Sequence, residues 1–331
     1  MKYLTLLFLS TSVIFFSACS SKRVYAPEDT VGSWSKQGTM DNSIIDITSN
    51  VALMSNRNIL SKSGNINIKI DENYRVLSSS DGWIISSTID GKLKLQYIED
   101  KSIVHDFDFK KTVASASVKD DTLAVLFADN EMALYKISSN ELILKFQGGE
   151  SIALDSRIAN PYFMDNLVIF STLDGKVVII DSKEKKKLRT VIISSEDYFN
   201  NVIYFNIVDN KVIAATAYKI LSMAKKEIRE KYEIRTIAVK DKNIFIATKQ
   251  GEVISLTPDL QLNAKLKFPF AHFIGLIIRD EKVYILEKEG YLIEAPLDLS
   301  TYKVYDVDVD EGYVFIGDDI FYINDEYISV K

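Results

Sequence analysis

The sequence predicts an all-β fold made of eight similar four-stranded units, and three observations support this prediction. First, isoleucine, valine, tyrosine and phenylalanine are abundant, whereas the 331 residues include only 13 glycines and 5 prolines. Residues with β-branched or aromatic side chains favour strands. Second, pairs of short apolar runs joined by a turn recur along the chain. Third, the glycines of these turns recur at multiples of about 40 residues, which is typical of a repeated supersecondary unit.

The clearest unit covers residues 165–181. Its apolar runs, residues 167–170 and 177–180, flank a Leu-Asp-Gly turn that ends at Gly175. Asp-Gly is a favoured hairpin turn because glycine adopts a positive φ without steric cost. Continuous apolar runs of this length are typical of strands that are covered on both faces. The segment therefore predicts a β-hairpin buried between neighbours.

The same pattern returns with a regular spacing. The turn glycines Gly91, Gly175, Gly251 and Gly290 are separated by 84, 76 and 39 residues, which leaves room for one more copy in each of the two long gaps. Eight units of about 39 residues predict an eight-bladed β-propeller of four-stranded blades, with seven blades as a minor alternative. A β-sandwich has no such period. Copies that have lost the turn glycine lie at residues 123–134 and 212–221, and degenerate copies lie near the ends of the chain at 51–60 and 313–322.

Shorter apolar runs precede and follow each hairpin, and they supply the first and the fourth strand of each unit. Residues 142–146 and 262–268 follow their hairpins, and residues 202–208 precede one. We expect residues 43–48 to begin the first unit and residues 327–330 to end the last. On this reading no strand is exchanged between the two ends of the chain.

The N-terminus carries an export signal. Lys2 precedes an apolar stretch that ends in Phe-Ser-Ala-Cys at residues 16–19, which resembles a bacterial lipobox. The resemblance implies a signal peptide at 1–18 and a mature chain anchored in membrane lipid through an acylated Cys19. An uncleaved anchor or a buried cysteine is the alternative. Ser20, rather than aspartate, favours the periplasmic face of the outer membrane.

A polar stretch follows the lipobox. Residues 19–41 contain Pro27, Gly32 and Gly38 and show no apolar period, so we expect a flexible tether. The propeller would then occupy residues 42–331.

The composition disfavours several classes of function. The formal net charge of −6 does not suit a nucleic-acid partner. One cysteine and two histidines leave no basis for a disulfide framework, most metal sites or a Cys-His nucleophile. Glycine-rich phosphate loops are also missing. We therefore expect no catalytic residues, no cofactor and no metal, and we interpret the acidic residues 306–310 as solvated.

Two charged segments have simple interpretations. Residues 183–187 (Lys-Glu-Lys-Lys-Lys) could attract anionic lipid or a partner, but they fall where the third and fourth strands of a unit should turn, so a solvated loop is favoured. Residues 222–232 suggest either a highly charged hairpin or a short helix that projects from the rim.

Residues 171–181, preceded by Pro161 and Asp165, resemble the repeat of quinoprotein-type (PQQ-like) propellers. In a lipoprotein, the pattern is similar to the BamB-like outer-membrane protein assembly factors. That resemblance implies a protein–protein scaffold, with the barrel-insertion machinery as the envelope partner. The quinoprotein enzymes of the same repeat family hold a quinone and calcium, and this chain has no second cysteine to match those that many of them carry beside the cofactor.

Aromatic residues gather at equivalent joins between consecutive units. Equivalent loops of a propeller share one face, and aromatic anchors dominate protein interfaces. The alternative is packing between blades near the axis, and a second possible function is the sensing of an envelope ligand in the axial channel. The candidate partner surface consists of Tyr162, Phe163, Tyr198, Phe199, Phe268 and Phe270.

Overall fold

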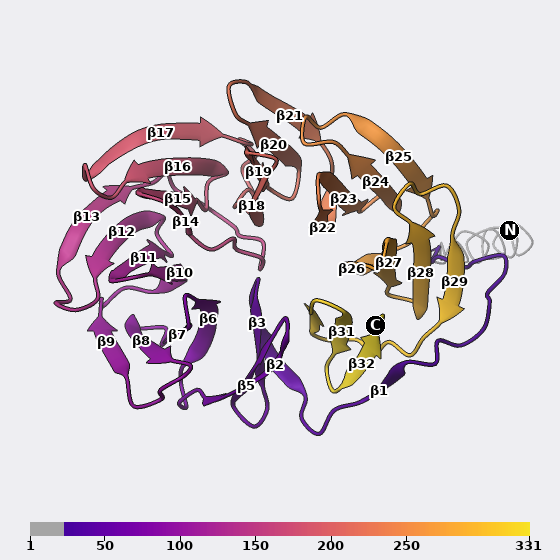
Figure 1. Cartoon of the computed structure of the whole chain (residues 1–331), viewed down its shortest axis with the longest axis horizontal. Helices are drawn as coiled ribbons and strands as arrows, with labels where there is room; N and C mark the ends of the chain where they lie inside the picture. The colour runs from indigo at the N-terminus through magenta and orange to yellow at the C-terminus, as the bar shows by residue number, and fades with distance from the viewer. Residues whose placement is uncertain (1–22) are drawn as a thin grey trace, which may run out of the picture.

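The computed structural model describes residues 23–331, so the expected signal peptide at 1–18 and Cys19 lie outside the described residues. Within them, 32 strands form eight four-stranded antiparallel sheets arranged in a ring (Figure 1). The eight-bladed β-propeller is therefore confirmed. Among residues 23–331 no helix has the length and apolar character needed to cross a bilayer.

The first four blades follow one another along the chain, each with its first strand at the axis and its fourth at the rim. Their bounds are β2 (Ile44–Ile47), β3 (Val51–Met54), β4 (Asn58–Ser61) and β5 (Gly64–Lys69); β6 (Arg75–Ser80), β7 (Trp83–Ser87), β8 (Lys92–Tyr97) and β9 (Val104–Asp108); β10 (Val113–Lys119), β11 (Thr122–Phe127), β12 (Glu131–Lys136) and β13 (Leu142–Gln147); and β14 (Tyr162–Met164), β15 (Leu167–Ser171), β16 (Lys176–Asp181) and β17 (Lys186–Ile192).

Blades five to seven continue the pattern, and the eighth differs in the origin of its outermost strand. The bounds are β18 (Tyr204–Val208), β19 (Lys211–Ala215), β20 (Lys219–Met223) and β21 (Glu227–Lys231); β22 (Ile234–Lys240), β23 (Asn243–Thr248), β24 (Glu252–Leu256) and β25 (Leu262–Lys267); β26 (Phe273–Arg279), β27 (Lys282–Glu287), β28 (Tyr291–Pro296) and β29 (Lys303–Asp306); and β30 (Val314–Ile316), β31 (Ile320–Ile323), β32 (Glu326–Ser329) and β1 (Gln37–Thr39).

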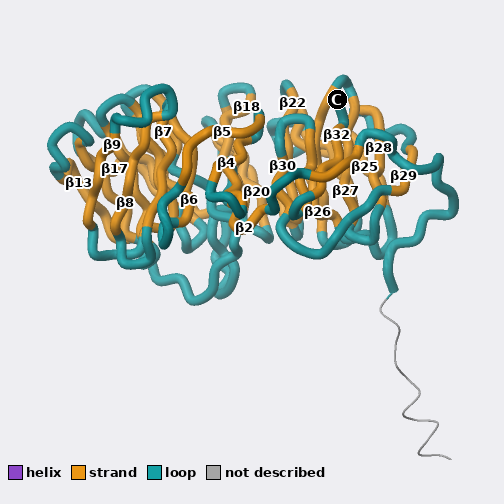
Figure 2. The backbone as a smooth tube through the Cα atoms, turned by 90° about the horizontal axis from the view of Figure 1, so that it is seen from below, coloured by secondary structure: helices purple, strands orange, loops and turns teal. Residues whose placement is uncertain are grey.

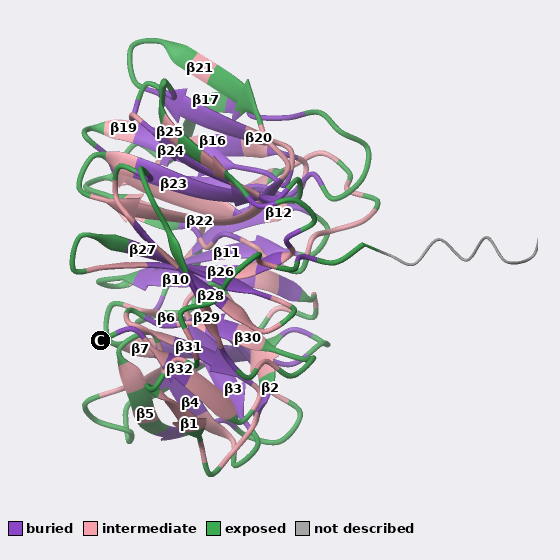
Figure 3. Ribbon diagram, turned by 90° about the vertical axis from the view of Figure 1, so that its right-hand side faces the viewer, coloured by how far each residue is buried: buried purple, intermediate pink, exposed green. Residues whose placement is uncertain are grey.

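A separate hydrophobic cluster fills each of the eight interfaces between neighbouring blades. The second strands supply much of this core because both of their faces are covered; β11, for example, is buried from Leu123 to Phe127. One cluster joins the first and last blades through Leu60 and Phe315. The fourth strands are far more exposed, as β21 is in Figure 3. The ring is therefore closed by packing as well as by strand pairing.

The closure of the ring corrects one expectation from the sequence. Strand β1, from the N-terminal segment, pairs with β32 and completes the last blade. The expectation that no strand is exchanged between the chain ends was wrong, because β32 is only the third strand of its blade. The N-terminal residues supply the missing fourth strand.

The segment before β1 also packs on the propeller, so the expected tether at 19–41 does not describe residues 25–39. Tyr25 is buried between the rings of Phe268 and Tyr291. The Val31 amide donates to the carbonyl of Val304, and the Trp34 amide to that of Asp306. We call residues 23–39 the N-terminal strap. The propeller therefore includes residues that precede its expected start at residue 42.

The two charged segments lie at the rim. Residues 222–232 lie in and around the hairpin of β20 and β21, so the short helix does not form. Residues 182–185 make the turn between β16 and β17, where the sequence placed a turn between third and fourth strands. Both segments are exposed along most of their length.

Candidate functional site

One face of the ring carries the turn glycines and the connectors between the blades. In an antiparallel four-stranded blade, the turn between the second and third strands lies at the same end as the exit of the fourth strand. The connectors to the next blade and the turn glycines therefore share a face, which we call the connector face. In Figure 2 it is the lower side, and the C-terminus lies on the upper side.

Each connector begins on the turn of its own blade. The Ile193 amide, directly after β17, donates to the Gly175 carbonyl over 2.9 Å, and the Phe268 amide donates to the Gly251 carbonyl over 2.7 Å. Gly175 has a φ of 79°, in the region that favours glycine. The recurring glycines thus fix both a turn and the departure point of the next connector.

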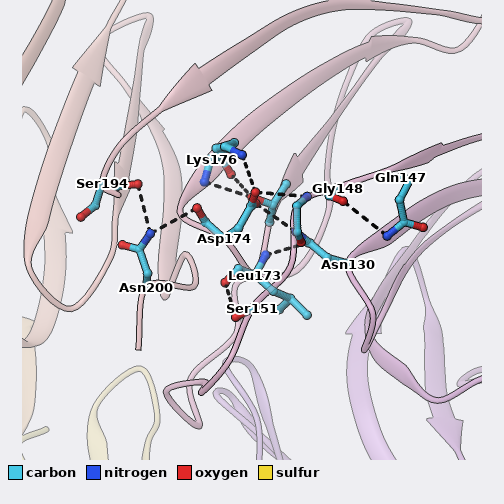
Figure 4. Close-up of polar contacts among 11 residues, drawn as sticks. Asn130, Gln147, Gly148, Ser151, Leu173, Asp174, Lys176, Ser194 and Asn200 are labelled. Carbon is cyan, nitrogen blue, oxygen red and sulfur yellow. Dashed lines mark hydrogen bonds and ion pairs between the residues drawn. The ribbon is translucent and has the colours of Figure 1, made fainter. Parts of the chain in front are cut away.

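In the third blade, which lacks the turn glycine, Asn130 takes its place and links two blades (Figure 4). Asn130 has a φ of 67° and is 1% exposed. Its Nδ2 donates to Asp174 Oδ1 and to the Gly149 carbonyl, both over 2.9 Å, and its Oδ1 accepts from the Leu173 amide over 2.9 Å. The turns of the third and fourth blades are therefore held together by one buried side chain.

The Asp174 carboxylate is the acceptor at the centre of this network. Burial alone would raise its pKa, but hydrogen bonds from Lys176, Thr172 and Asn130, together with the Lys176 charge, hold the pKa below its usual value of 3.8. The ionised form is thus favoured in the folded protein. It fixes the start of the connector at Gly149, whose amide donates to Asp174 Oδ2 over 3.2 Å.

The two longest connectors, residues 148–161 and 193–203, bind each other. The Phe199 amide donates to the Ala153 carbonyl over 2.9 Å. Asn201, fully buried, accepts from the Asp155 amide over 2.7 Å and donates to the Arg157 carbonyl over 2.6 Å. These bonds give the connectors a defined shape, although neither contains a strand or a helix.

The first of these connectors also reaches other blades. Arg157 forms an ion pair with Asp155 and donates to the backbone carbonyl of Arg235 in β22, on the sixth blade. Asn160 Nδ2 donates to Ser49 Oγ of the first blade over 3.1 Å. Burial would raise the pKa of Asp155, but the bonds and charge of Arg157 lower it overall. The connector is thereby tied to blades on both sides of the axis.

The structure separates the six aromatic candidates. Tyr198, Phe199 and Phe270 project from the connector face and are 55%, 47% and 55% exposed. Phe268 is 1% exposed in the core between the sixth and seventh blades. Its assignment to a partner surface was therefore wrong, and for this residue packing between blades is the correct reading.

Tyr162 and Phe163 lie elsewhere, in strand β14 beside the axis. The Tyr162 ring packs against Phe205 with the ring centroids 5.1 Å apart, and Phe163 packs against the cluster between the third and fourth blades. Both residues line an axial cavity rather than the outer part of the connector face. The candidate surface is thus reduced to Tyr198, Phe199 and Phe270.

The backbone at two of these rings is unusual. Phe199 has a φ of 52° and Phe270 a φ of 67°. Bulky residues are uncommon in this left-handed region, and such strain is often found at functional sites. Two exposed aliphatic side chains on the same face were not among the candidate residues predicted from the sequence. They are Ile89 and Ile152, which are 82% and 75% exposed. Isolated apolar residues in polar loops gave no periodic signal.

The axial cavity has a volume of about 440 Å³. Its wall combines hydroxyl and amide groups with aromatic rings and a few charges, so it offers both hydrogen bonds and stacking surfaces. Among residues 23–331, no group of three or more His, Cys, Asp or Glu side chains could hold a metal ion. Polar lining residues include Asn50, Lys62, Ser79, Asp81, Ser117, Lys119, Asn160 and Tyr204.

These features define the class of protein as a closed eight-bladed propeller with an ordered connector face. No family model matches the chain. The chain is 27% identical, over 90% of its length, to the plasminogen-binding protein PgbB of Helicobacter pylori, in each of two strains. It spans 64% of the length of these relatives.

Solved structures share the fold. BamB from Moraxella catarrhalis matches 89% of the chain with a TM-score of 0.67 at 9% identity, and 98% of that structure is covered. The C-terminal WD40 domain of Sif2 matches 92% of the chain and is covered completely, with a TM-score of 0.63 at 11% identity. The computationally designed Ika8 protein matches 91% of the chain and is 99% covered, with a TM-score of 0.60 at 14% identity. The fold is thus a BamB-like β-propeller.

Proposed function

We propose that this protein is a lipid-anchored propeller of the bacterial envelope that binds a protein partner through its connector face and acts as a scaffold without catalysis. The observation that carries this proposal is the exposure of Phe199 and Phe270 on turns with positive φ. Rings presented on a fixed backbone lose little conformational freedom on binding. The hydrogen bonds of the buried Asn130 and Asn201 side chains hold the connectors of this face in a defined conformation in the unbound protein.

The strap supports an orientation for the anchored protein. Arg23 lies over the Phe270 ring, with Cζ 5.6 Å from the ring centroid, and Tyr25 is buried beside Phe268. Cys19 precedes Arg23 by four residues, a length that spans at most about 14 Å. An acylated Cys19 would therefore hold the connector face close to the bilayer. A partner that is itself embedded in the membrane fits this placement.

The anchor has a direct test. Cells that produce the wild-type chain should incorporate labelled fatty acid into it, and Cys19→Ala should abolish the label because the sequence contains no other cysteine. Label that persists in the Cys19→Ala protein would contradict lipid attachment at this residue.

A role in outer-membrane protein assembly is the finer part of the proposal. It is supported by the resemblance of the repeat and its lipobox to BamB-like factors, and the fold similarity to BamB is compatible with it. The test is affinity purification from detergent-solubilised envelopes. The wild-type protein should recover a barrel-insertion component. Recovery of other proteins only would contradict the assembly role but leave the scaffold in place.

A paired variant tests the connector face in the same experiment. Replacing Tyr198 and Phe199 by serine should reduce recovery of the partner about tenfold, because interface aromatics are frequent hot spots. The matched control replaces Ile103 and Leu262 by serine, two exposed residues near the starts of fourth strands on the opposite face. Equal recovery with both double variants would contradict binding through the connector face.

Plasminogen is a second candidate partner, and the similarity to PgbB over most of this chain favours it. Immobilised plasminogen should retain the purified protein if this function is shared, and an absence of retention would exclude it.

The axial cavity supports another alternative, the binding of a small envelope ligand. A fragment of cell-wall glycan is a suitable probe because the cavity wall combines hydroxyl groups with Tyr162 and Phe205. Calorimetric titration of the protein with this fragment should give saturable heat, and its absence would count against sensing of such glycans.

A further inference from the structure

A groove at the rim lies apart from both the connector face and the axis. It has a volume of about 780 Å³ and runs between β13 of the third blade and the β16–β17 turn of the fourth. Turns between third and fourth strands lie opposite the connector face, so the groove opens on the other side of the ring. The residues lining it are Lys136, Glu141, Leu142, Ile143, Ser182, Lys183 and Lys185.

The groove is basic although the protein is acidic overall. Lys136, Lys183 and Lys185 are exposed, and none of the three forms an ion pair with any of residues 23–331. Glu141 is the only acidic residue in the lining. The formal net charge of the whole chain is −6. A net positive charge is therefore concentrated here, and a counter-charge outside the lining is Asp121, whose pKa is lowered by a side-chain hydrogen bond and, to a smaller extent, by the Lys136 charge.

The turn that carries two of these lysines has a fixed backbone. Asp181 Oδ1 accepts hydrogen bonds from the Lys183 amide over 3.0 Å and the Glu184 amide over 2.8 Å. Lys185 has a φ of 51°, which reverses the chain direction. The Oδ1 atom of Asp181 is thus occupied by its own turn. The ammonium groups of Lys183 and Lys185 extend from a defined position.

The groove also offers apolar surface. Leu142 is 47% exposed at the start of β13, and Ile143 beside it is half-buried. Farther along β13 lies Phe146, and Nζ of Lys187 in β17 is 5.6 Å from the centroid of its ring, so this pair bridges the two blades. The groove therefore combines cationic groups with an apolar strip along an outermost strand.

We propose that this groove binds an extended acidic segment of a protein partner. Carboxylates of the bound segment would form ion pairs with Lys136, Lys183 and Lys185, and an apolar side chain of the same segment would pack on Leu142. Complementary charge of this kind selects partners and accelerates their association. The proposal rests on the scaffold function and adds a second surface to it.

The position of the strap argues against anionic lipid as the occupant. Arg23 of the strap contacts Phe270, which lies on the connector face between the sixth and seventh blades. The groove lies between the third and fourth blades and opens on the opposite side. A chain anchored close to Arg23 would hold the groove away from the bilayer that anchors it.

The experiment measures binding of a fluorescein-labelled peptide, in which glutamates flank one leucine, to the full-length protein in detergent. In the test variant, Lys136, Lys183 and Lys185 are each replaced by glutamine. The matched control replaces Lys225, Lys226 and Lys231, exposed lysines in and beside the β20–β21 hairpin, which changes the net charge equally. We expect the dissociation constant to rise about tenfold for the test variant, and less than about twofold for the control.

Each other outcome overturns the proposal. Equal weakening by the two variants would show that binding follows net charge alone, and wild-type protein that does not bind the peptide would exclude the site. A parallel titration uses vesicles of phosphatidylglycerol. If these bind more tightly than the peptide and lose affinity with the test variant only, the groove is a lipid site instead. Failure here leaves the connector face unaffected, because the serine variants test it separately.

Discussion

Gly38 in β1 lies directly opposite Tyr327 in β32, and the tyrosine ring covers the glycine so closely that a Cβ added at Gly38 would lie 2.9 Å from Tyr327 Oη. This pair joins the two ends of the chain within one blade. The ring is thus closed by residues near the expected anchor. A glycine that the sequence placed in a flexible tether has instead a fixed and crowded position.

The strap should contribute measurably to stability through Trp34. Its indole Nε1 donates to the Ser329 carbonyl over 2.8 Å, and its ring packs against Tyr284 and Tyr305. Trp34→Ala should lower the free energy of unfolding by about 2–3 kcal/mol, since both packing and a hydrogen bond are lost. Urea denaturation measures this change. Val31→Ala, at an exposed side chain, is the control, and equal midpoints for the two variants would contradict a structural role for the strap.

The turn glycines make a second prediction. Gly175→Val should destabilise by about 2–4 kcal/mol, because φ is positive and the new side chain would collide with Asn200 and with the Ser194 carbonyl. Gly64 also has a positive φ, but nothing lies within 4 Å of an added Cβ. Gly64→Val should therefore cost only about 1–2 kcal/mol. Denaturation midpoints in the reverse order would show that the glycine turn and its connector are not packed as described.

The Asp174 network predicts a dependence on acid pH. The folded protein holds the pKa of Asp174 below its usual 3.8, so the ionised carboxylate stabilises the fold above that value, and the contribution is lost as the pH falls through the folded pKa. Asp174→Asn should thus destabilise by about 1–2 kcal/mol at pH 7 and progressively less below pH 4. Asp165→Asn, at an exposed turn of the same blade, controls for the loss of charge. A constant difference between wild type and Asp174→Asn across this range would refute the assignment.

For Glu287 we predict that stability depends on pH in the opposite direction. Its side chain is buried, which raises its pKa above the usual 4.5 even though the His272 and Glu289 amides donate to it. A raised pKa favours the protonated form in the folded state, so this contribution is complete below pH 4.5 and is lost as the pH rises through the folded pKa. Glu287→Gln should flatten the fall in stability above pH 4.5. Thermal unfolding at a series of pH values measures the slope, and parallel curves for the two proteins would contradict the prediction.

Much of the fold could be predicted because it depends on local patterns. Apolar runs around Asp-Gly at Gly175, repeated at a regular spacing, indicate buried hairpins, and Gly91, Gly175, Gly251 and Gly290 all have positive φ. The closing strand could not be predicted in this way. Strand β1 (Gln37–Thr39) is short and has no apolar pattern, and its partner β32 lies at the far end of the sequence. Only the need of the last blade for a fourth strand explains their position.

The candidate site was partly predictable for a similar reason. The position of aromatic residues in connectors follows from the repeat, but burial within a connector depends on single backbone angles. Phe268 and Phe270 are separated only by Pro269, yet the first is in the core and the second, with its positive φ, is exposed. The contact between residues 148–161 and 193–203 gave no sequence signal, because it is made by backbone groups and by the side chain of a single asparagine, Asn201.

Photo-crosslinking in living cells tests the central claim most directly, that a protein partner binds the connector face. A photoreactive phenylalanine analogue would be placed at Phe199 or Phe270 on that face, and at Leu262 on the opposite face, where the side chain is 59% exposed. We predict that positions 199 and 270 give a crosslink to the same protein and that position 262 does not. A crosslink to that protein from position 262 but from neither of the other two would contradict the account.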